Sequence, residues 1–333
     1  MFHLHQSTEF CTRNLIDMEK HSSKITAATL LVALGIIYGD IGTSPLYVLK
    51  AVIGERTITP ELVLGGVSCV IWTLVLQTTL KYIWLTLKAD NEGEGGIFSL
   101  YALVRRYGKK LVIPTILGAT TLLADGIITP PISVASAVEG LTMIDGWQHL
   151  PTVPIVMVIL SGLFFFQRFG TQKVGSVFGP IMLVWFSMLL VLGLIHISKA
   201  PYVLQAFNPM LGLKLLITYP KGFWLLGAVF LATTGAEALY SDLGHCGRKN
   251  IRITWGFVKT CLVINYLGQA AWLLTDAGTS LGTRNPFFEL MPSWFLLIGI
   301  LIATMATIIA SQALISGSYT LISEAMNLNF WPR

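Results

Sequence analysis

Three carboxylic acids lie inside long apolar stretches of the sequence, where ionised side chains are rare. Asp40, Asp125 and Glu237 each stand beside glycine, proline or hydroxyl residues that weaken a helix. An ionised acid at the centre of a membrane helix costs roughly 2.5–3.5 kcal/mol, so three uncompensated acids would forfeit roughly 8–10 kcal/mol. Apart from Lys81, no Lys or Arg lies deep in an apolar stretch. A bound cation or a proton is therefore the simplest partner for these acids.

The neighbours of Asp40 and Glu237 are groups that bind alkali cations. Residues 40–44 and 233–237 combine a carboxylate with hydroxyls and glycine, and Pro45 follows the first group. Weakly hydrated alkali cations are held by carbonyl and hydroxyl oxygens, with a carboxylate supplying charge. We therefore expect unwound turns at both places, with carbonyls and hydroxyls free for an ion. No cluster rich in nitrogen or sulfur ligands occurs, which disfavours a transition metal.

Asp125 begins a polar stripe. Thr129 follows it by one helical turn and Ser133 by two, so the carboxylate and both hydroxyls share a helix face and could line a pore. The alternative is that the hydroxyls satisfy carbonyls freed by Pro130 and Pro131, as in other kinked membrane helices.

The elements that must carry these residues are membrane-spanning helices. Hydrophobic residues make up 54% of the 333 residues, charged residues 12%, and mean hydropathy is +0.70, so a soluble globule is excluded. A span needs about 20 apolar residues. The sequence predicts eight, at 27–49, 61–87, 111–141, 152–167, 174–197, 222–243, 251–275 and 292–322.

Two of these spans contain interruptions that match each other. Residues 42–47, GTSPLY, and residues 235–240, GAEALY, share the pattern G-x-x-x-L-Y five spans apart. Because the sixth span is an odd number of spans after the first, the two segments run in opposite directions through the bilayer, as in inverted repeats. Paired interrupted spans indicate a transporter's midplane binding site, although a match of three letters can also arise by chance.

Charge distribution predicts the orientation. With the N-terminus inside, the inner segments carry 15 of the 22 Lys and Arg, so both ends are expected in the cytoplasm. Residues 1–24 read as a cytoplasmic tail without a signal peptide. Cys11, Cys69, Cys246 and Cys261 are scattered, which predicts neither disulfides nor a zinc site. No nucleotide loop or nucleophile motif occurs, so no enzymatic activity or cofactor is expected.

Several long motifs resemble the KUP/HAK/KT family of potassium uptake permeases over about 24–333. They lie at 38–47, 89–96, 128–130 with 136–140, 174–175 with 178–182, 235–240 with 244–245, 265–269, 285–288 and 308–317. The resemblance implies proton-coupled potassium import across the cell (inner) membrane. It also implies an all-α LeuT/APC-like fold with a first repeat at about 25–197 and a partial second repeat at 222–333. Residues 89–96 are expected to be an inner hinge or gate.

The resemblance also implies which residues contact the ion. The expected potassium and proton site comprises Asp40, Thr43, Tyr47, Asp125, Thr129, Thr234 and Glu237. Potassium itself would be held by the three acids and nearby backbone carbonyls. The expected partners are potassium, protons and the lipid bilayer, with a homodimer left open and no nucleic acid.

Three alternatives remain at this stage. An amino-acid or organic-cation permease would want a roomier site, and Asp40 would repel a substrate carboxylate. A passive channel would conduct without proton dependence, but no T-V-G-Y-G filter occurs. The third alternative is a non-transporting fragment or half of a split protein, because the second five-span repeat would need two more spans.

Overall fold

The structure is a computed structural model that describes residues 25–144, 146–167, 175–220 and 222–332. The predicted tail at 1–24 lies outside the described residues. The first part of the described chain forms α2 (Ala27–Ile37), α3 (Gly39–Thr43), η1 (Ser44–Leu46), α4 (Val48–Ile53), α5 (Pro60–Thr73), η2 (Leu74–Leu85), η3 (Thr86–Lys88), α6 (Ile97–Val104), η4 (Arg105–Tyr107), η5 (Lys109–Leu111), α7 (Val112–Glu139), η6 (Gly140–Met143) and α8 (Thr152–Gln167).

The second part begins with a long helix and ends with another. It forms α9 (Gly175–Lys199), η7 (Pro201–Phe207), α10 (Pro209–Thr218), α11 (Gly222–Phe230), η8 (Leu231–Thr233), α12 (Ala238–Ser241), α13 (Leu243–Cys246), α14 (Arg248–Thr275), η9 (Phe288–Leu290) and α15 (Ser293–Asn327). Most η elements are 3-10 helices, whereas η2 is a π-helix. No strand occurs among the described residues, only the isolated bridges Thr57–Ser280 and Asn91–Glu94.

The helices confirm a polytopic membrane protein, with fewer spans than predicted. Among the described residues, six helices are long and apolar enough to cross a membrane, and the bent pair α2 and α3–η1 makes a seventh. The predicted fourth span, 152–167, is the shorter helix α8. Its 16 residues rise about 24 Å, less than the roughly 30 Å of a hydrocarbon core. The count of eight is therefore replaced by six or seven.

The first span is interrupted as predicted, but the unwound turn expected at 40–44 is wrong: residues 39–43 form the short helix α3, and the bend lies before it. The chain bends by 72° between Ala27–Ile37 and Gly39–Leu46. Tyr38, at φ −99° and ψ 13°, leaves the helical conformation at the bend. Pro45 then stands at the start of the 3-10 turn η1, where its missing N–H removes a helical hydrogen bond. The result is a short helix, α3, that holds Asp40 between two breaks.

The sixth predicted span is also interrupted. Helix α11 passes into η8, and residues 234–237 connect η8 to α12 without regular helix. Gly235 has φ +82°, a left-handed conformation that glycine adopts without steric cost. Glu237 directly precedes α12 as its N-cap. Gly235 therefore allows the unwound turn that ends at the carboxylate of Glu237.

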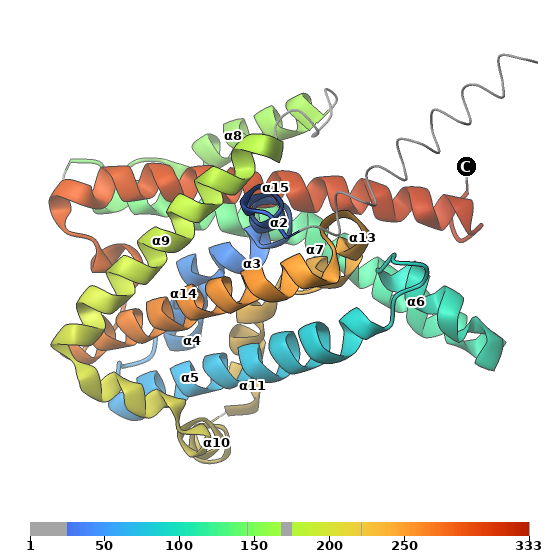
Figure 1. The fold of residues 1–333 in the computed structure, drawn as a ribbon. Helices are drawn as coiled ribbons and strands as arrows, with labels where there is room; N and C mark the ends of the chain where they lie inside the picture. Colours follow the sequence, from blue (N-terminus) through green and yellow to red (C-terminus); the bar gives the residue numbers. More distant parts are fainter. Residues whose placement is uncertain (1–24, 145, 168–174, 221, 333) are drawn as a thin grey trace, which may run out of the picture.

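Two long helices form a close-packed pair behind these breaks. Helices α9 and α14 pack against each other, and in Figure 1 they lie close together at the left and diverge toward the top and the right. A Cβ added at Gly268 would lie 2.6 Å from the Gly193 Cα, so only small residues permit this approach. Helices α15 and α7 also lie side by side, and α15 contacts α3.

The two ends of the bundle are distinguished by their ion pairs. We call the end with the Lys50–Glu139 and Arg284–Asp276 pairs the Lys50 end. We call the opposite end, with the Arg248–Asp90 pair, the Arg248 end. Helix α14 runs between them, from Arg248 to Thr275.

Candidate functional site

The three acids singled out by the sequence converge in the structure. Asp40 comes from α3, Asp125 from the middle of α7 and Glu237 from the turn before α12. One carboxylate oxygen from each lies within 4.8 Å of the others. Asp40 is buried, with 6% of its surface exposed. Helices that are distant in sequence thus assemble a cluster of three carboxylates, here called the acid triad.

A cavity of about 250 Å³ opens beside the acid triad. Its walls come from α7 and from the interrupted span: Thr121, Leu122, Asp125, Phe230, Thr233, Thr234 and Glu237. The pocket is wide and open, with room for an ion together with water. The predicted contributor Thr234 is part of this lining.

Gly235 makes the close approach between the two broken spans possible. A Cβ at Gly235 would lie 2.6 Å from the Asp40 Cβ and 2.7 Å from Asp40 Oδ2. Its φ of +82° is strained for any residue with a side chain. Conformation and space therefore both require glycine at this position.

The polar stripe on α7 faces the interior of the bundle. The Thr129 hydroxyl donates a 2.7 Å hydrogen bond to Asp125 Oδ1, and Thr129 and Ser133 are 5% and 1% exposed. Helix α7 continues through Pro130 and Pro131 without a break. Since Thr129 donates to the carboxylate, its hydroxyl orients Asp125 instead of satisfying a carbonyl freed by the prolines.

Asp40 and part of Asp125 have no hydrogen-bond partner within the described structure. Both carboxylate oxygens of Asp40, and Asp125 Oδ2, are buried without a donor. Three ion pairs occur among the described residues, Lys50–Glu139, Arg248–Asp90 and Arg284–Asp276. None of them includes the acid triad. Unpaired buried carboxylates at this spacing suit a cation, because neighbouring negative charges repel each other in a buried site.

The hydroxyls of Tyr47 and Thr43, also predicted to contact the ion, have different hydrogen-bond partners. Tyr47 is buried and its hydroxyl lies 3.3 Å from Ser44 Oγ. Ser44 donates in turn to the Leu231 carbonyl at 3.0 Å, which joins the two broken spans. Thr43 donates its proton to the Asp40 carbonyl at 2.9 Å. Its hydroxyl is therefore engaged with the backbone of α3.

The backbone carbonyls of residues 40–44 were expected to be open to an ion, but Gly42 O has a side-chain partner, as do the carbonyls of Pro45 and Leu46 that follow. Side-chain donors from other elements occupy these three. Trp185 Nε1 donates to Gly42 O at 2.9 Å, Gln269 Nε2 to Pro45 O at 3.0 Å and Asn285 Nδ2 to Leu46 O at 2.9 Å. Sequence reasoning missed these donors, although a buried Asn265 and Gln269 one turn apart in an apolar span were a signal.

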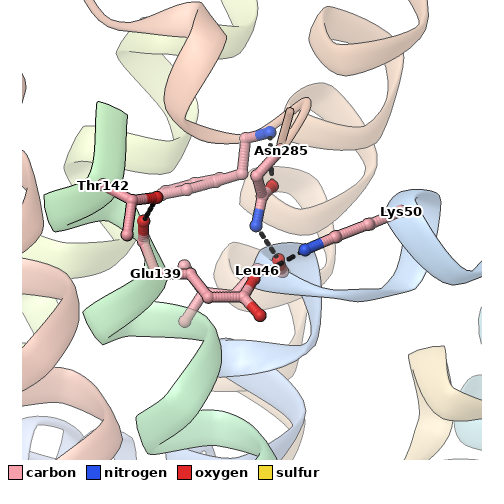
Figure 2. A network of polar contacts seen from close by, with 6 residues as sticks. Leu46, Lys50, Glu139, Thr142 and Asn285 are labelled. Atoms are coloured by element: carbon pink, nitrogen blue, oxygen red, sulfur yellow. Dashed lines mark hydrogen bonds and ion pairs between the residues drawn. The ribbon is translucent and has the colours of Figure 1, made fainter. Parts of the chain in front are cut away.

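Polar contacts at the Lys50 end join three segments that are distant in the sequence (Figure 2). Asn285 holds the Leu46 carbonyl, and the Lys50 ammonium lies 2.7 Å from Glu139 Oε2. Thr142 donates to the Glu139 carbonyl at 2.8 Å. The short segment Leu46–Lys50 is thereby tied to the end of α7 and to the loop before η9.

At the Arg248 end, the predicted hinge 89–96 contacts the end of the interrupted span. Asp90 pairs with Arg248, and Tyr240 donates its hydroxyl to the Ala89 carbonyl. Asp242, just beyond the helical span that ends at Ser241, is half-buried, and burial raises its pKa to about 6 while His245 opposes the rise. The loop is thus joined to α12–α14 three residues from Glu237.

Comparison with known proteins identifies a family of similar sequences. A family model described as the K+ potassium transporter integral membrane domain matches residues 27–333. A probable potassium transport system protein Kup of Cytophaga hutchinsonii is 61% identical, covering 96% of this chain and 49% of its own length. A probable potassium transport system protein Kup of Clostridium perfringens is 54% identical, covering 93% of this chain and 49% of its own length. A probable Kup 1 of Lactococcus lactis subsp. lactis is 52% identical, with 93% and 48% covered.

The chain spans about half the length of the curated relatives it matches. No solved structure matches it. The family model covers almost the whole chain, including all three acids of the triad. The resemblance inferred from the motifs is thereby confirmed, and this chain belongs to the potassium transporter family that the integral membrane domain defines.

Proposed function

We propose that the chain takes up potassium across the membrane and binds the ion at the acid triad. The observation that supports this most directly is the convergence of Asp40, Asp125 and Glu237 within 4.8 Å without a basic partner. Potassium and its close analogue rubidium are weakly hydrated and accept carboxylate and hydroxyl oxygens as ligands. Thr129, Thr234 and Tyr47 would add hydroxyls, and Thr43 would stabilise α3.

We further propose that transport is coupled to protons. Three neighbouring carboxylates, one buried and two half-buried, and one monovalent cation leave an excess of negative charge, and at least one proton reduces it. An acid that releases this proton on one side of the membrane would couple the two gradients. The breaks in both antiparallel segments favour a LeuT-like exchange of access between the sides. In this proposal the Arg248 end faces the cytoplasm of the cell membrane.

Rubidium uptake tests the proposal. The host cells lack their own potassium importers and express this chain, or this chain joined to the remaining half of the Cytophaga hutchinsonii relative. Uptake is measured at two external pH values for the unsubstituted chain, Asp40→Asn and Glu237→Gln. The matched control is Glu55→Gln, an exposed acid outside the site. We expect uptake that increases at acid pH, is lost in both site variants and is unchanged in the control.

The outcomes separate the alternatives. Uptake that is independent of pH favours a passive channel. Amino-acid uptake without rubidium uptake favours a permease. Activity of the joined protein alone means that the chain is a part of the transporter that needs the other half. Inactivity of both forms, with normal amounts in the membrane, contradicts the proposed function.

A further inference from the structure

We infer that Gln269 is a positioning residue for the cation site, because its amide holds the broken first span where Asp40 and Tyr47 reach the site. The inference deepens the proposed function, on which its transport measurement rests. The structural measurement described below does not depend on that function.

The amide of Gln269 uses both of its protons between two elements. Its Nε2 atom donates to the Pro45 carbonyl at 3.0 Å and to Asn265 Oδ1 at 2.8 Å. An amide NH₂ group has two donors, so both are engaged. Gln269 is 1% exposed, and a buried carbonyl that loses its donor keeps its desolvation penalty without compensation. The contact with Pro45 is therefore one that water cannot replace.

Asn265 fixes the direction in which Gln269 points. Its Oδ1 atom accepts from Gln269, and its Nδ2 atom donates to the Leu189 carbonyl of α9 at 3.2 Å. Asn265 has no exposed surface. The contact of Gly193 with Gly268 holds the two helices together beside this pair of amides. A chain of hydrogen bonds thus runs from the α9–α14 pair to the turn η1.

Pro45 lies where a small displacement affects the site. The preceding residue, Ser44, bonds the Leu231 carbonyl of the other broken span and lies next to the Tyr47 hydroxyl. Proline supplies no N–H, so η1 is held by fewer backbone hydrogen bonds than a regular helix. The amide of Gln269 compensates for this by fixing the carbonyl of the same residue. Loss of the amide should therefore loosen Ser44 and Tyr47 together.

The test compares Gln269→Met with Asn250→Leu. Methionine keeps the length of glutamine but has no donor. Asn250 is a matched control because it is a buried amide on the same helix, and it bonds only the nearby Cys246 carbonyl. For rubidium uptake we expect Gln269→Met to raise KM roughly tenfold while Vmax changes less than about twofold. Asn250→Leu should leave KM unchanged, even if it lowers Tm.

A double variant tests the chain of amides. Asn265→Leu should raise KM as Gln269→Met does, and the combined variant should be no worse than either, because all three remove the same support. Additive effects would contradict the chain. An equal KM in Gln269→Met and the unsubstituted protein, with both folded, would overturn the positioning role.

Hydrogen exchange separates this inference from the proposed function. Backbone amides in residues 38–50 of the purified chain should exchange faster in Gln269→Met than in Asn250→Leu or the unsubstituted chain. This result would support the positioning contact even if no form of the protein transports rubidium. Unchanged exchange in residues 38–50 would overturn the inference, whatever the uptake measurement shows.

Discussion

The Cα of Gly235 faces the carboxyl group of Asp40, so closely that a methyl group on it would lie 2.7 Å from Asp40 Oδ2. The two residues belong to the two interrupted spans and are 195 positions apart in the sequence. This contact brings the unwound turn 234–237 against α3. It makes Gly235 a sensitive position for the geometry of the acid triad.

Gly235→Ala should abolish most rubidium uptake. The substitution adds a Cβ that overlaps Asp40, and a residue with a side chain at φ +82° is strained by about 1–3 kcal/mol. The measurement is uptake, corrected for the amount of protein in the membrane. Gly227→Ala is the matched control because its Cβ would meet nothing within 4 Å and it lies inside α11. Equal activity of both variants would contradict this contact.

Ser44→Ala should raise KM for rubidium roughly fivefold, equivalent to the loss of about 1 kcal/mol. The reason is that the Ser44 hydroxyl donates to the Leu231 carbonyl and thereby joins the two broken spans. Ser198→Ala, which removes an exposed hydroxyl bonded within its own helix, serves as the control. A KM shift of similar size in both variants would mean that the Ser44 contact has no particular role.

Breaking the Lys50–Glu139 pair should have a small, salt-dependent effect on stability. The two side chains are 31% and 41% exposed, and exposed ion pairs contribute about 0–1 kcal/mol. We expect a double-mutant cycle of Lys50→Met and Glu139→Gln, followed by thermal unfolding in detergent, to give a coupling in this range. The coupling should decrease at high salt. A coupling of several kcal/mol that salt does not change would show that the pair is shielded from water.

Asp242→Asn should stabilise the protein at pH 7 and have little effect below pH 4. Burial raises the pKa of Asp242 to about 6, above the value of about 3.9 in an unfolded chain. Between these values the folded state binds more protons than the unfolded state, so stability falls as pH rises from about 4 to about 6 and is then level.

The neutral amide escapes this loss, which amounts to about 3 kcal/mol at most at pH 7. The check is the difference in Tm between Asp242→Asn and the unsubstituted protein as a function of pH. A difference that is the same at pH 4 and pH 7 would contradict the raised pKa.

Local features of the sequence were sufficient to predict many elements of the structure. The turn spacing of Asp125 and Thr129 predicted a shared face, and the two side chains are hydrogen-bonded. Glycine and proline predicted an interruption of the first span and the unwound turn at Gly235, although the first span bends at Tyr38 and residues 39–43 are helical. These features depend on backbone conformation and on spacing along one helix, so the neighbouring residues determine them. The length of an apolar stretch was less reliable, as the short helix α8 shows.

The tertiary structure decided which polar groups remain free. The sequence offered the carbonyls near Asp40 as ion ligands, but Gln269 occupies the Pro45 carbonyl from 224 residues away. Likewise, Ser44 bonds Leu231 across 187 residues. Such contacts depend on how helices that are distant in sequence pack. The residues next to a carbonyl in the chain do not determine which side chain will donate a hydrogen bond to it. The residue types therefore determined the membrane environment, the presence of interruptions and the three acids. Helix packing determined the convergence of the acids and the side-chain partners of the backbone carbonyls at the interruptions.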